Sequence, residues 1–175
     1  MTRLENILNE NKKFVEKTEK IDLPHNPQKE LAIFSCMDCR LIDFLTPALG
    51  LKRGDAKVIT NAGNKIVDDE PIRSLAVAIH ALGAKEVLVV GHTECGMANV
   101  DIESLKSKML ENGISQDDID QFDLGEWIGS FDSEEENVIA SCSKIKNHPL
   151  IPDIPVHGLI IDIVTGELKV LVEDY

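Results

Sequence analysis

Two short clusters of cysteine, histidine and charged residues stand out in this sequence. One is CMDCR at residues 36–40, and the other is GHTECG at residues 91–96. Proteins bind zinc through thiolates and imidazoles, and a site with three protein ligands leaves the fourth position open for water, as catalytic zinc sites do. Cys36, His92 and Cys95 are three such ligands. The clusters therefore predict one catalytic zinc site, with one ion per subunit.

The charged side chains of the first cluster suit the chemistry of such a site. Two thiolates and a neutral imidazole leave a zinc ion with no net charge, so its bound water is less acidic than on a three-histidine zinc, where the pKa is about 7. Asp38 could accept a hydrogen bond from that water and orient it. Arg40 could keep Asp38 ionised through its planar fork of N–H donors. We therefore predict Asp38 and Arg40 as the catalytic pair.

Both clusters directly follow apolar runs that are typical of buried strands, and strand and helix patterns alternate along the chain. Strands separated by helices indicate a parallel sheet, and VTGE at residues 164–167 indicates a final hairpin. The predicted fold class is α/β: a mostly parallel sheet of about four strands plus one antiparallel edge strand, with helices on both faces. The predicted strands are 31–36, 56–60, 86–91, 156–163 and 168–172, and the predicted helices are 40–51, 68–82, 95–112 and one that begins at Ser133.

In open α/β sheets, ligands bind just beyond the carboxyl ends of the strands, which is where both clusters lie. A third segment, NAGN at residues 61–64, follows the second predicted strand. Glycine allows backbone to approach a ligand closely because it has no Cβ. We expect Gly63, Gly91 and Gly96 to have this role around the metal and the substrate.

The composition of the 175 residues fits a single domain, residues 1–175, with residues 1–25 as an N-terminal helical arm. The formal charge is −13 and no long basic run is present, which argues against a nucleic-acid partner. No apolar segment approaches the roughly 20 residues of a membrane span, and the first residues lack the apolar stretch of a signal peptide. We expect a soluble, cytoplasmic protein with no membrane partner.

Three motifs in order resemble the β-class carbonic anhydrases, and in particular their short, plant-like members: C-x-D-x-R, N-A-G-N and G-H-x-x-C-G, each after a predicted strand. The match covers residues 31–100, and PVHG at residues 155–158 extends it. The resemblance implies a zinc enzyme that reversibly hydrates carbon dioxide to bicarbonate and a proton. It also makes His25 a candidate pocket residue, since plant-like members carry a pocket glutamine near this position.

The sequence departs from the family pattern at two positions. Cys39 stands where the family usually has a small hydroxyl residue, and Thr60 stands where it usually has a basic one. Cys39 leaves two other classes open: a closed structural zinc site of Cys36, Cys39, His92 and Cys95, or a redox protein that uses the C-x-x-C spacing. Within the enzyme class, hydrolysis of carbonyl sulfide or carbon disulfide on the same site is the alternative.

The first residues of the chain carry a helix signal with no evident place on the sheet. Thr2 and Glu5 have the spacing of a capping box, and Leu4, Ile7 and Leu8 form an apolar stripe. The resemblance implies that this helix packs against a neighbouring subunit, as it does in family members. We therefore expect a homodimer or a dimer of dimers.

Overall fold

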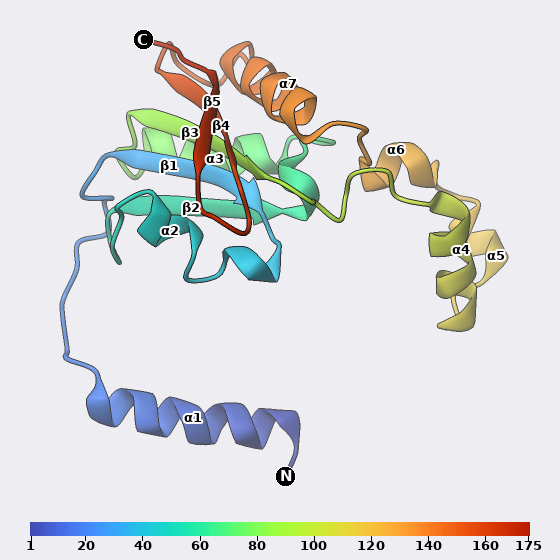
Figure 1. Cartoon of the computed structure of the whole chain (residues 1–175), viewed down its shortest axis with the longest axis horizontal. Helices are drawn as coiled ribbons and strands as arrows, with labels where there is room; N and C mark the ends of the chain where they lie inside the picture. Colours follow the sequence, from blue (N-terminus) through green and yellow to red (C-terminus); the bar gives the residue numbers. More distant parts are fainter.

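The computed structural model describes all 175 residues, and five strands form one sheet in the order β2-β1-β3-β4-β5 (Figure 1). The first four strands of the sheet are parallel, and β5 pairs with β4 antiparallel. The predicted fold class is confirmed. The strands are β1 (Leu31–Cys36), β2 (Ala56–Asn61), β3 (Glu86–His92), β4 (Val156–Ile161) and β5 (Leu168–Val172).

Helices α3 (Glu70–His80) and α7 (Glu134–Lys146) cover one face of the sheet. Pro71 lies in the first turn of α3, where its missing N–H is tolerated, and the Ser133 side chain caps α7 by accepting from the Glu136 N–H. The core between this face and the two helices is mostly apolar, and its largest buried side chains include Phe34, Leu75, Val89, Val138 and Ile145.

The second face is covered more thinly, by the 3-10 turn η1 (Cys39–Leu41) and the single helical turn α2 (Leu45–Ala48). The prediction of one continuous helix over 40–51 is wrong. Ile42 is extended and Asp43 adopts a left-handed φ of 55°, so the backbone turns away from the helical path between the two short elements.

The prediction of a helix over 95–112 is wrong in its first part, because α4 runs only from Ile102 to Glu111. Asn99 lies inside the predicted range and has a left-handed φ of 55°, so a helix cannot run through it. The Asp101 side chain then starts α4 by accepting from the Ser104 N–H. Two further short helices, α5 (Gln116–Ile119) and α6 (Leu124–Ile128), complete an arm that projects from the sheet (Figure 1).

Helix α1 (Arg3–Lys17) is the other projecting element and lies apart from the sheet (Figure 1). The capping box is present: the Thr2 hydroxyl accepts from the Glu5 N–H, and the Glu5 carboxylate accepts from the Thr2 N–H. The helix continues well beyond the apolar stripe, yet none of its residues is buried. None of the helices combines the length and the apolar composition that crossing a membrane requires.

Candidate metal centre

Three potential metal ligands meet at the carboxyl edge of the sheet. Cys36 and His92 are the last residues of the neighbouring strands β1 and β3, and Cys95 lies in the turn after β3. Their ligand atoms all lie within 4.8 Å of one another, and the two sulfurs are 3.9 Å apart. Cys36 and Cys95 are 59 residues apart in sequence. Parallel pairing of β1 and β3 is therefore what assembles the cluster.

The imidazole of His92 is oriented by its own backbone. Its Nδ1 lies 2.8 Å from the Thr93 carbonyl oxygen, which can only accept, so Nδ1 carries the proton. The other nitrogen, Nε2, is left with a free lone pair. It is buried and has no hydrogen-bond partner. In the protein alone, this buried lone pair beside two thiols has no partner. A soft or borderline metal ion bound by all three groups would satisfy it.

The two sulfurs also behave as an incomplete ligand pair. The pKa of Cys36 is lowered, first by the hydrogen bond from the Cys95 thiol and also, against burial, by the backbone N–H groups that surround it. The pKa of Cys95 is raised, first by its bond to Cys36 and then by burial. Two thiolates this close repel each other unless a cation lies between them. Two thiolates and one imidazole suit zinc and do not suit magnesium or calcium.

Asp38 and Arg40 form a bidentate ion pair beside the cluster. Arg40 donates from Nε to one carboxylate oxygen at 3.0 Å and from Nη2 to the other at 2.7 Å, and its backbone N–H adds a third bond at 2.9 Å. These bonds, above all those from the Arg40 guanidinium, lower the pKa of Asp38 to about 2. Arg40 Nη2 also donates to the Glu94 carbonyl, so it ties the first ligand loop to the second.

The ionised carboxylate of Asp38 faces the ligands, since its Oδ2 is 3.8 Å from His92 Nε2. Two small adjoining hollows of about 250 and 310 Å³ open over this point, and both are lined by Cys36, Met37 and Asp38. Their apolar rim is open to solvent: Met37 is 66% and Ile42 is 70% exposed. The arrangement can hold one metal ion and a small molecule of few atoms next to a carboxylate.

The three predicted glycines have different surroundings. A Cβ on Gly63, whose φ is 68°, would lie 2.7 Å from the Phe131 ring and 2.9 Å from Met97, so the loop beside Cys36 requires glycine. A Cβ on Gly91 would lie 2.7 Å from Val138, which places this glycine under α7 rather than in the hollow. Gly96 lines the smaller hollow with open space around it.

His25 and Cys39 lie outside the cluster of this chain. The His25 carbonyl accepts from Lys57 Nζ near the start of β2, at the opposite edge of the sheet, so its place in the pocket stays a prediction. Cys39 is exposed and is not among the three grouped ligands. The sequence reasoning missed Glu134 and Asn137 of α7, which bond to the two loops of the site.

The chain is similar in sequence and structure to known proteins. The family model described as carbonic anhydrase matches residues 31–168. The Bacillus subtilis protein YtiB is 40% identical over 185 residues, covering 100% of this chain and 99% of that protein. β-Carbonic anhydrase 1 of Mycobacterium tuberculosis is 35% identical over 150 residues, covering 84% of this chain and 85% of that protein. The crystal structure of β-carbonic anhydrase isoform I of Trichomonas vaginalis superposes with a TM-score of 0.95 at 39% identity, over all of both chains.

Proposed function

This chain belongs to the β-class carbonic anhydrase family, which hydrates carbon dioxide, and we propose that Cys36, His92 and Cys95 hold its zinc ion. The observation that carries the assignment is the buried, unpartnered Nε2 of His92 beside two sulfurs. When bound, zinc would supply a Lewis acid that lowers the pKa of water and stabilises negative charge developing on oxygen.

The protein's own groups would prepare the reactants. Asp38 stays ionised across the physiological pH range because Arg40 holds both of its oxygens, so it accepts a hydrogen bond and cannot donate one. We assign Asp38 the role of orienting the attacking water, so that a lone pair of the water oxygen points at the carbon of carbon dioxide. Arg40 prevents Asp38 from rotating into the ligand cluster, which lies only 3.8 Å away.

Zinc content and activity, measured together, test this assignment. Protein purified without chelator should contain about one zinc per chain by elemental analysis, as three protein ligands with one open position require. Stopped-flow hydration of carbon dioxide should be lost after chelation and restored by zinc. Protein that contained no zinc and still hydrated carbon dioxide at full rate would overturn it.

Carbon disulfide is a second candidate substrate, because a curated carbon disulfide hydrolase of Acidithiobacillus thiooxidans is 32% identical over 162 residues. Carbon disulfide is a linear isostere of carbon dioxide with larger and more polarisable atoms, so discrimination depends on the space and access above the ligands. Turnover of both substrates by the same preparation decides between them. We expect hydration of carbon dioxide to have the higher kcat/KM.

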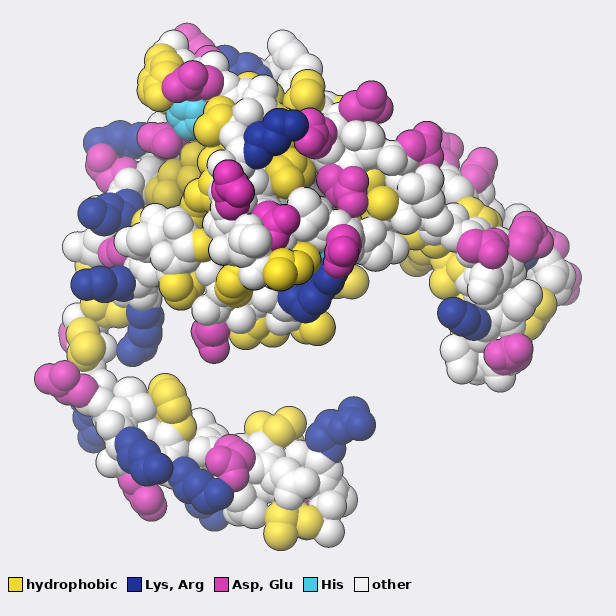
Figure 2. All heavy atoms as spheres, viewed as in Figure 1, with side chains coloured by type: hydrophobic (Ala, Val, Ile, Leu, Met, Phe, Trp, Pro, Cys, Tyr) yellow, Lys and Arg dark blue, Asp and Glu magenta, His cyan; other side chains and the backbone are white.

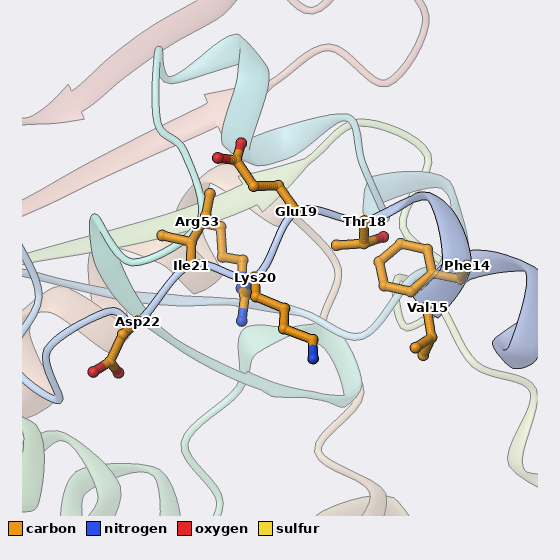
Figure 3. A pocket seen from close by; sticks show the side chains of 8 residues that line it. All are labelled: Phe14, Val15, Thr18, Glu19, Lys20, Ile21, Asp22 and Arg53. Carbon is orange, nitrogen blue, oxygen red and sulfur yellow. The ribbon is translucent and has the colours of Figure 1, made fainter.

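We further propose that the protein is a homodimer or a dimer of dimers in which α1 contacts the neighbouring subunit. Leu4, Ile7 and Phe14 are 64%, 59% and 64% exposed in the single chain, and Figure 2 shows hydrophobic side chains open to solvent along α1 between lysines and arginines. A hollow of about 730 Å³ at the C-terminal end of α1 is lined by apolar and charged side chains such as Phe14, Ile21 and Arg53 (Figure 3). A second copy that covered these surfaces would remove them from water.

A further inference from the structure

The hydrogen-bond ladder between β3 and β4 ends at Thr93 with an exchanged acceptor. The two strands pair in parallel up to His92 and Ile161, and the Thr93 N–H extends the pattern by donating to the Ile161 carbonyl at 3.1 Å. In a regular parallel ladder, the Thr93 carbonyl would then accept from the N–H of Ile163. The Ile163 N–H donates instead to the Thr93 hydroxyl at 3.0 Å. The side chain of Thr93 therefore takes the place of its own carbonyl.

The carbonyl that this exchange releases serves the histidine of the metal centre. The Thr93 carbonyl oxygen lies 2.8 Å from His92 Nδ1 and accepts its proton. The imidazole is only 1% exposed, and its other nitrogen, Nε2, belongs to the ligand cluster. A hydrogen bond at one ring nitrogen fixes both the tautomer and the rotation of a histidine that binds metal through the other nitrogen. The exchanged acceptor at Thr93 thus makes a carbonyl available to orient His92.

Both partners in the exchanged bond are held in place. Ile163 belongs to the turn between β4 and β5, in which the Asp162 carboxylate accepts from the N–H groups of Val164 and Thr165 at 2.9 and 2.7 Å. The direction of the Ile163 N–H is therefore set by a turn with its own hydrogen bonds. Threonine is β-branched, so its hydroxyl has few rotamers from which to choose. The turn acts through Thr93 as a support for the histidine.

We propose that Thr93 is a positioning residue for the metal centre, whose hydroxyl binds the Ile163 N–H so that its carbonyl stays with His92. The proposal rests on the assignment of Cys36, His92 and Cys95 as ligands. A residue at 93 with no side-chain acceptor would leave the Ile163 N–H without a partner, and that group would then compete for the carbonyl. Loss of an outer partner of a ligand typically costs about 10- to 100-fold in metal affinity or activity.

Thr93→Val tests the proposal, because valine keeps the shape of threonine and lacks the oxygen. The variant should release zinc to a chromogenic chelator about 10-fold or more faster than the parent protein. The NMR signal of the His92 Nδ1 proton should also shift, because its acceptor is now shared. Thr93→Ser restores the hydroxyl and should bring both quantities back near the parent values. Measurement well below the unfolding temperature of every variant keeps global unfolding out of the release rate.

Thr165→Val is the matched control. It removes the same kind of bond from the same turn, since the Thr165 hydroxyl accepts from the Glu167 N–H at 3.2 Å, and this bond has no link to a ligand. Zinc release and the His92 signal should match those of the parent protein. If Thr93→Val does not fold, Thr93→Ala compared with Thr93→Ser gives the same test, because these two variants differ by one oxygen atom.

Two results would overturn the proposal alone. One is equal zinc release from Thr93→Val and Thr165→Val, and the other is an unmoved His92 signal in Thr93→Val. A parent protein that binds no zinc would overturn the proposal together with the ligand assignment.

Discussion

The metal centre and helix α1 contrast in how the chain specifies them. At the centre, Cys36, His92 and Cys95 are buried and are positioned by strands, turns and side-chain bonds from distant parts of the sequence. Helix α1 has a complete capping box and an apolar stripe, yet no residue of it is buried. Local signals are therefore sufficient to form α1 but not to place it, whereas the centre exists only through long-range pairing.

This contrast implies that changes at the centre act within one chain and that changes on α1 act between chains. Loss of a ligand or of the Asp38–Arg40 pair should impair chemistry without changing the oligomeric state. Loss of the apolar stripe on α1 should change the oligomeric state first. Each of the following variants tests one side of the contrast.

The largest effect is expected from Cys95→Ser, which removes a thiolate ligand from the buried cluster. Zinc content should fall well below one per chain, and carbon dioxide hydration should fall to the uncatalysed rate, because metal binding and its site form together. Elemental analysis and stopped-flow kinetics measure both quantities. Cys142→Ser is the matched control: Cys142 is also buried but belongs to α7 and faces the apolar core, so zinc should remain. Retention of zinc in Cys95→Ser would break the ligand assignment.

Asp38→Asn should have the next largest effect. It keeps the size of the side chain but removes the negative charge that pairs with Arg40, so hydration should slow by about a hundredfold or more while zinc stays bound. The control is Glu94→Gln, which removes the other, largely exposed, carboxylate near Arg40, at 3.6 Å. Exposed ion pairs contribute little, so this variant should stay close to the parent rate. Equal rates for both variants would remove Asp38 from the mechanism.

Ile7→Glu tests the other side of the contrast. A charge in the apolar stripe of α1 should weaken assembly, so light scattering at micromolar concentration should move toward the monomer mass of 19.3 kDa. Zinc should remain bound, because α1 makes no contact with the cluster. Asn9→Glu adds the same charge outside the stripe and should leave the mass of the assembly unchanged. A parent protein that is already monomeric would contradict the proposed role of α1.

The smallest effect is expected from Cys39→Ser, because Cys39 is exposed and lies outside the ligand cluster. Zinc content and hydration rate should match those of the parent protein. Loss of zinc would instead indicate a closed site of three cysteines and one histidine, and loss of a disulfide-exchange activity would indicate the redox alternative.

The sheet was predictable from the sequence because its signals are local and strong. Val87 to Val90 form an unbroken apolar run, which only a strand covered on both faces requires, and the other strands carry similar patterns. The helices over 40–51 and 95–112 were predicted too long, because left-handed residues such as Asp43 and Asn99 are set by contacts of the folded loops and leave no periodic signal.

The site was predictable to the extent that its residues lie in contiguous motifs. Cys36 with Asp38, and His92 with Cys95, each come from one strand end, so the parallel sheet brings them together. Asn137 was not predictable, since it stands 74 residues from Gly63 in a helix whose apolar stripe alone was visible. The sequence offered one sign that this helix contacts a polar partner: polar side chains at helical spacing next to that stripe.

Parallel pairing of β1 with β3 also constrains the order of events as the chain folds. Until the strands align, His92 and Cys95 form one half of the site and Cys36 the other, separated by more than 50 residues of chain. Closing a loop of that length is among the slower steps of folding. Tight metal binding must therefore follow strand pairing. In a refolding experiment, the lag before zinc uptake would then measure the time that the central sheet takes to assemble.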